Sequence, residues 1–76
     1  MTNRKKIEKF CYDRNLKIGD LTFLGASYWQ LEISLHEQLQ YQTYDTSMGD
    51  TVEEGIELMF KDIEDDMSNI QLLISR

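Results

Sequence analysis

Apolar side chains recur every three or four positions along one long stretch, residues 51–74. At about 100° per residue they fall on one stripe of a helix, and acidic side chains fall opposite them. Thr51 followed by Glu54 forms a capping box, which marks the helix start. The stripe stays in phase past Ser68-Asn69, so we expect one continuous helix. A stop at Ser68-Asn69 would instead leave Ile70 to Ser75 as a short strand. The stripe comprises Val52, Ile56, Met59, Phe60, Ile63, Met67, Ile70 and Ile74.

A shorter helical pattern opens the chain. Thr2 or Asn3 can cap a first helix that runs to about Arg14. Asn15 suits the left-handed position that follows a helix, and Leu16 would then fold back onto the helix's apolar edge. That edge consists of Ile7, Phe10 and Cys11.

Alternating apolar and polar side chains between the helices predict three strands, over residues 17–24, 27–35 and 38–44. Short loops between them favour an antiparallel meander. Its apolar face needs a cover, and each helix has one apolar stripe to offer. The expected fold class is therefore α+β. We expect one domain over residues 1–76, in the order helix, three strands, long helix (αβββα), with both helices on one face of the sheet.

Parity constrains the strand register, because a slip of one residue exchanges the two faces of a strand. A three-residue turn at Gly25-Ala26-Ser27 places Phe23 opposite Trp29. Pairing Ile33 with Leu39 or Tyr41 keeps the apolar side chains together, and it requires an odd-length loop near His36-Glu37. In that register Leu39, Tyr41 and Thr43 share the inner face, and the outer face displays a second candidate surface of Tyr28, Gln30, Gln40, Gln42 and Tyr44.

Charge is unevenly distributed along the chain, whose net charge is −6. Residues 1–17 hold six basic and two acidic residues, which sum to +4, whereas residues 45–66 hold nine acidic residues and one lysine, which sum to −8. An acidic surface repels nucleic acid and attracts basic surfaces over about 8–10 Å. The simpler interpretation is a solvated helix face that the basic first helix partly neutralises. The alternative is a surface that binds a basic partner.

The sequence contains no pattern typical of an enzyme. Cys11 is the sole cysteine, so we expect no intramolecular disulfide, and His36 forms no Cys-His motif with it. The stretch from Asp45 to Asp50 lacks the glycine and glutamate of a calcium loop. We expect no metal, no cofactor and no membrane span, and a cytoplasmic protein, in the host cell if a phage encodes it.

The order of elements resembles the double-stranded-RNA-binding domain, which implies nucleic-acid binding. That family opens its last helix with lysines, whereas the matching stretch here, Gly49 to Glu54, is acidic. Weak binding through the basic first helix is therefore only an alternative. The stretch from Gly49 to Ile56 is similar to the strand-to-helix passage of HicB-like antitoxins, which implies a self-associating regulatory module. That family's opening strands are replaced here by a helix.

In size, acidity and α+β pattern the chain resembles small inhibitor proteins of phages and mobile elements, of the anti-CRISPR or anti-restriction type. The resemblance implies a non-enzymatic DNA mimic that occupies a nucleic-acid-binding surface. The expected partner-binding residues are Glu53, Glu54, Glu57, Leu58, Asp62, Glu64, Asp65 and Asp66.

The competing expectation is a homodimer. A helix of about 24 residues is about 36 Å long, whereas strands of about seven residues span about 23 Å. The excess helix must therefore pack on something, which a second copy would supply. It lies around Ile70, Leu72, Leu73 and Ile74.

Overall fold

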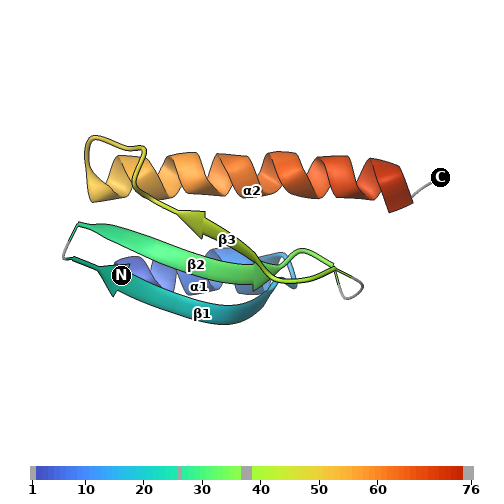
Figure 1. Cartoon of the computed structure of the whole chain (residues 1–76), viewed down its shortest axis with the longest axis horizontal. Coiled ribbons are helices and arrows are strands. Elements are labelled where there is room, and N and C mark those ends of the chain that lie inside the picture. Colours follow the sequence, from blue (N-terminus) through green and yellow to red (C-terminus); the bar gives the residue numbers. More distant parts are fainter. Residues whose placement is uncertain (1, 26, 37–38, 75–76) are drawn as a thin grey trace.

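The computed structural model describes residues 2–25, 27–36 and 39–74, with side chains as far as Leu72. The chain forms α1 (Asn3–Asp13), β1 (Lys17–Leu24), β2 (Tyr28–Ser34), β3 (Gln42–Asp45) and α2 (Val52–Ile74). The strands make one antiparallel sheet in the order β1-β2-β3, which confirms the predicted αβββα fold (Figure 1). Expectations that involve Ala26, Glu37, Gln38 and Ser75, or the side chains of Leu73 and Ile74, lie outside the described residues.

The local signals at both ends of α1 operate as predicted. The Thr2 hydroxyl accepts a hydrogen bond from the Lys5 amide at 3.2 Å. Asn15 has φ 58°, and the Leu16 amide donates to the Cys11 carbonyl at 2.9 Å. This is a Schellman ending, and it turns the buried Leu16 side chain back under the helix. The chain therefore leaves α1 in the direction that starts β1.

Both helices bury their apolar stripes against the same face of the sheet. One core cluster joins side chains of α1, of β1 and β2, and of α2. Phe10 of α1 stacks on Phe60 of α2 with ring centroids 3.9 Å apart, and the Arg14 guanidinium lies 3.7 Å from the Phe10 centroid. The two helices are thus joined directly as well as through the sheet. The cluster contains Ile7, Phe10, Cys11, Leu16, Leu21, Leu31, Ile33, Ile56, Met59 and Ile63.

The register of β1 against β2 is the predicted one. Phe23 pairs with Trp29, and their rings are 4.9 Å apart. A bulge at Gly19 shifts the register, so that Ile18 pairs with Ile33. The alternation of apolar and polar residues did not predict this bulge. It allows Ile18 to pack against the core while the following strand keeps Leu21 on the inner face.

The predicted parity of the third strand was wrong. Ile33 pairs with Gln42, one residue out of step with the expected Ile33–Tyr41 pair, and Leu31 pairs with Tyr44. Gln42 and Tyr44 therefore lie on the inner face, and Thr43 lies on the outer one. The physical reason is the tyrosine's amphipathic character: its ring is half-buried while its hydroxyl donates to Asp66 on α2 at 2.6 Å.

The loop before α2 fixes where the long helix starts. The Trp29 amide donates to the Thr46 hydroxyl at 2.8 Å, and the Thr46 amide donates to the Trp29 carbonyl at 3.0 Å. Thr46 is the buried polar residue of the described chain. Gly55, in the first turn of α2, lies directly against the Thr46 carbonyl. The helix can come this close to the loop because glycine has no Cβ atom.

The long helix is continuous through Ser68-Asn69, as predicted, and runs to Ile74. The Thr51 hydroxyl caps its start by accepting from the Glu54 amide at 3.1 Å. In Figure 1 the last turns of α2 extend past the ends of the strands. The longest dimension of the molecule, 41 Å, follows from this helix. Among the described residues, no helix combines the length and apolar character needed to cross a bilayer.

Candidate functional site

Apart from Glu53, the acidic residues of α2 divide into three groups according to what they face. The first group lies toward α1. Lys6 forms an ion pair with Glu57 at 3.1 Å, and Arg14 donates to Glu64 at 3.0 Å. Such exposed pairs contribute about 0–1 kcal/mol each, but they place a positive charge beside each of these carboxylates. The basic first helix thus neutralises part of the acidic helix, as the simpler interpretation of the charge pattern expects.

The second group lies toward the sheet and consists of Asp66. Its carboxylate accepts the hydrogen bond from the Tyr44 hydroxyl, which links the middle of α2 to β3. Burial raises the pKa of Tyr44 far above its ordinary value, and the hydrogen bond to Asp66 raises it further. Asp66 therefore has a structural partner within the chain, which restricts its availability to any other molecule.

The third group lies on the solvent side of α2, with Asp62 at its border toward β3, where its charge helps to raise the pKa of Tyr44. Glu54, Asp62 and Asp65 are exposed, and no ion pair engages them within the described chain. They surround Leu58 at one helical turn before it, one turn after it and two turns after it. Leu58 is 40% exposed. We call Glu54, Leu58, Asp62 and Asp65 the acidic face; Lys61 borders it.

The remaining predicted contact, Glu53, is exposed in the first turn of α2 and lies outside the acidic face. An acidic residue at this position interacts favourably with the positive end of the helix dipole. Its presence therefore has an explanation that involves no partner. Of the eight residues predicted to contact a partner, the structure gathers Glu54, Leu58, Asp62 and Asp65 on one exposed surface.

The second predicted surface is not assembled. Tyr28 and Gln30 lie on the outer face of the sheet, but Gln42 and Tyr44 lie on the inner face. Gln40 is exposed in the connection between β2 and β3. The tyrosine pair that suggested this surface is therefore separated by the sheet itself.

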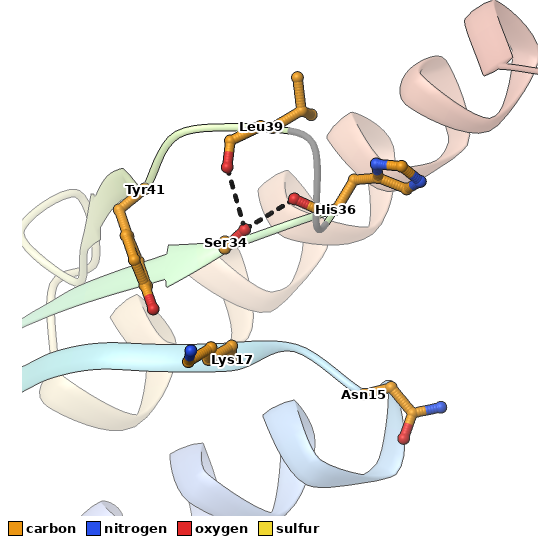
Figure 2. A pocket seen from close by; sticks show the side chains of 6 residues that line it. All are labelled: Asn15, Lys17, Ser34, His36, Leu39 and Tyr41. Carbon is orange, nitrogen blue, oxygen red and sulfur yellow. Dashed lines mark hydrogen bonds between the residues drawn. The ribbon is translucent and has the colours of Figure 1, made fainter.

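A hollow that the sequence analysis missed lies beside the connection from β2 to β3, with a volume of about 300 Å³. The Ser34 hydroxyl is within hydrogen-bond distance of the His36 carbonyl at 2.8 Å and of the Leu39 carbonyl at 3.3 Å. In Figure 2 the Tyr41 ring reaches toward Lys17, whereas the side chains of Asn15 and His36 point in other directions. These side chains do not converge on one point, and the contacts of the Ser34 hydroxyl with the two carbonyls support the loop.

The basic residues of α1 are largely engaged within the chain. Arg4 donates to the Leu21 carbonyl at 2.7 Å, and Lys9 pairs with Asp13 at 2.9 Å. Lys6 and Arg14 pair with α2, as described above. Of the six basic side chains in residues 1–17, those of Lys5 and Lys17 have no ion pair or hydrogen bond within the described chain. This arrangement does not favour phosphate binding through α1.

The loop from Asp45 to Asp50 is explained by its own hydrogen bonds. One oxygen of the Asp45 carboxylate accepts from the Ser47 amide at 3.1 Å and from the Ser47 hydroxyl at 2.6 Å. This is an Asx turn, a local motif that needs no ion. Within the described part of the chain, no three His, Cys, Asp or Glu residues gather closely enough to hold a metal ion.

Cys11 is fully buried in the core, and burial raises the pKa of its thiol from 9.0 to about 11 although Arg14 opposes the shift. We expect iodoacetamide to modify the folded protein at pH 8 at least 100-fold more slowly than the unfolded one, since a shift of two pKa units removes that much thiolate. Mass spectrometry with and without urea measures both rates. Equal alkylation rates would show that the thiol is accessible.

The raised pKa also makes stability depend on pH. Because the thiol of the unfolded chain ionises at a lower pH than that of the folded chain, we expect the free energy of unfolding to fall as the pH rises from about 9 to about 11.

Comparison with models of known protein families, with curated proteins and with solved structures finds no match for this chain.

Proposed function

We propose that this protein is a non-enzymatic inhibitor whose acidic face occupies a basic, nucleic-acid-binding surface of a partner protein. One observation carries the proposal: α1 and β3 engage Glu57, Glu64 and Asp66, but leave Glu54, Asp62 and Asp65 exposed around Leu58. A half-exposed leucine inside a field of carboxylates combines an apolar contact with charge complementarity.

The spacing of the carboxylates supports a DNA mimic. Along a helix axis, Asp62 and Asp65 are about 4.5 Å apart, and Leu58 lies about 6 Å from Asp62. Phosphates of one DNA strand are spaced by about 3.4 Å along the duplex axis. Carboxylates held at intervals of one helical turn present a row of negative charge to arginine and lysine side chains, as successive phosphates do. A CRISPR effector or another defence nuclease of a bacterial host is a partner of this kind.

The proposal predicts that neutralising the acidic face abolishes binding. The test variant is Glu54→Gln/Asp62→Asn/Asp65→Asn, which removes three charges and preserves side-chain shape. The wild type and the variant are immobilised, nuclease-treated bacterial lysate is passed over them, and the captured protein is then purified. We expect its affinity for the variant to fall at least tenfold, since charged contacts at an interface contribute on the order of 1–3 kcal/mol each.

The matched control is Glu53→Gln/Glu57→Gln/Glu64→Gln, which removes the same charge from another side of α2. We expect this control to retain the partner, and we expect duplex DNA to displace the partner from the wild type. If the test and control variants lose the partner equally, net charge alone attracts it. If DNA does not compete, the acidic face does not occupy a nucleic-acid-binding surface. Either result contradicts the proposal.

A further inference from the structure

The two edges of the sheet are built differently. On β1, the Arg4 guanidinium donates to the Leu21 carbonyl at 2.7 Å, and a bulge interrupts the strand at Gly19. These features hinder the addition of another strand, because one occupies a backbone acceptor and the other breaks the regular spacing. Among the described residues, β3 has neither feature: Gln42–Asp45 pair with β2 in regular register and include no lysine or proline. The edge of β3 is therefore the open edge of the sheet.

The backbone of β3 presents hydrogen-bonding groups at this open edge. Bonded and non-bonded pairs alternate along an antiparallel ladder. The Thr46 amide donates to the Trp29 carbonyl, and the alternation therefore directs the backbone groups of Thr43 and Asp45 away from β2. Both residues are exposed, and within the described chain no hydrogen bond to another element engages these groups. They are a template for one more strand.

The long helix gives the open edge its charge. In Figure 1, α2 lies beside β3 on the side away from β2, so a strand added there runs along the flank of the helix. The Tyr44 hydroxyl donates to Asp66, and Asp62 is near enough to help raise the pKa of Tyr44. Asp62 is exposed, and Leu58 lies one helical turn before it. The open edge is thus bordered by part of the acidic face.

We infer that the open edge of β3 receives an extended, basic segment of the partner protein as a fourth strand. The inference deepens the proposed function and rests on it for the choice of partner. The added strand is antiparallel, which is the orientation of the other strands and the more stable one per residue. Its residues opposite Thr43 and Asp45 bond to the backbone of β3. The residues between them direct lysine or arginine side chains toward Asp62.

The charges favour a basic segment over a second copy of this chain. Two copies joined through β3 would bring the acidic flanks of their α2 helices toward each other, and like charges disfavour that pairing. Four residues offer few backbone hydrogen bonds, so a strand held by those bonds alone is held weakly. Attraction between opposite charges supplies the rest, and it selects lysine and arginine.

The test uses short synthetic peptides in which threonine and lysine alternate. When the lysines point toward α2, the threonine amides face β3. Two forms of the peptide carry the same charge and the same number of N-methyl groups, on lysine amides in one and on threonine amides in the other. We expect the threonine-methylated form to bind at least tenfold more weakly, because it cannot donate to β3. Titration followed by NMR measures both affinities and should shift the amide signals of Thr43 and Asp45. Equal affinities, or the reverse order, overturn the inference.

Variants of the protein test the same edge. Thr43→Pro removes an amide that faces away from β2, so the sheet is retained, and we expect the affinity for the lysine-methylated peptide to fall at least tenfold. The matched control Thr43→Val changes the same side chain, keeps the amide and should bind as the wild type does. Circular dichroism verifies that both variants fold.

Capture from bacterial lysate separates this inference from the proposed function. If Thr43→Pro captures the partner as well as the wild type does, while the variant with a neutralised acidic face does not, strand addition is wrong and the inhibitor function stands. If the two methylated peptides differ as expected but duplex DNA does not displace the captured partner, the inhibitor function is wrong and strand addition stands.

Discussion

Replacing Gly55 by alanine should lower the free energy of unfolding by about 3 kcal/mol, although alanine is the better helix former by about 1 kcal/mol. A Cβ atom at this position would overlap the Thr46 carbonyl oxygen, which is backbone and has no rotamer to change. Thr46 is in turn held to Trp29 by two hydrogen bonds, so the loop cannot retreat without losing them. Urea unfolding followed by circular dichroism measures the effect.

The control for this prediction is Ser68→Ala, at an exposed position of the same helix. There the gain in helix propensity, about half a kcal/mol or less, acts without a steric penalty and should stabilise the protein slightly. A Gly55→Ala variant with an unchanged or higher urea midpoint would mean that the loop before α2 shifts at no cost. The close approach of helix and loop would then contribute nothing to specifying where α2 begins.

The second large effect should come from Phe10→Ala, with a loss of about 3–5 kcal/mol. Phe10 is 7% exposed, stacks on Phe60 and is covered by the Arg14 guanidinium. Its truncation leaves a cavity between the two helices and removes the ring contacts that join them. For a chain of 76 residues with a typical stability of about 4–11 kcal/mol, this loss is a large fraction of the total.

Two further variants make the Phe10 result specific. Tyr12→Ala removes an aromatic ring from the same helix at a 71% exposed position, and it should change stability by less than about 0.5 kcal/mol. Combining Phe10→Ala with Phe60→Leu in a double-mutant cycle measures the coupling between the rings. We expect a coupling energy of about 1 kcal/mol. Strict additivity would indicate that each ring packs independently on the core.

The sequence predicted the elements whose signals are local or strongly periodic. The apolar stripe of α2 stays in phase over the 23 residues of the helix, so the polar pair Ser68-Asn69 does not end the helical pattern. Asn15 and Leu16 end α1 through a motif that two residues are enough to indicate. The three-residue turn at Gly25-Ala26-Ser27 was chosen by parity alone, since it had to bring Phe23 and Trp29 to the same face.

For the third strand, the alternation of apolar and polar residues predicted the wrong register. Leu39 and Tyr41 are the more apolar residues of the stretch, so they were expected on the inner face together with Thr43. The structure leaves Leu39 and Tyr41 at least 40% exposed and turns Tyr44 inward. In the observed register the Tyr44 hydroxyl donates to Asp66, a contact between residues 22 positions apart in the sequence. No local pattern contains that information.

The same limit applies to the candidate site. The sequence identified the acidic helix and its exposed leucine, but periodicity could not show which carboxylates already have partners. The pairs from Lys6 to Glu57 and from Arg14 to Glu64 depend on how α1 lies against α2. Contacts of α2 with α1 and with β3 therefore engage Glu57, Glu64 and Asp66, Glu53 lies apart in the first turn, and the other four of the eight candidate residues form the acidic face.

The contact between α1 and α2 also determines when the chain can fold during its synthesis. Phe10 is synthesised before its stacking partner Phe60, and Arg14 is synthesised before its ion-pair partner Glu64. Until these residues have left the ribosome, the apolar edge of α1 has no helix to pack against. The hairpin of β1 and β2 can form earlier because its contacts are local. Folding of the whole chain thus requires translation of α2, and before that point the apolar surface that α2 covers on α1 and on the sheet is exposed to chaperones and proteases.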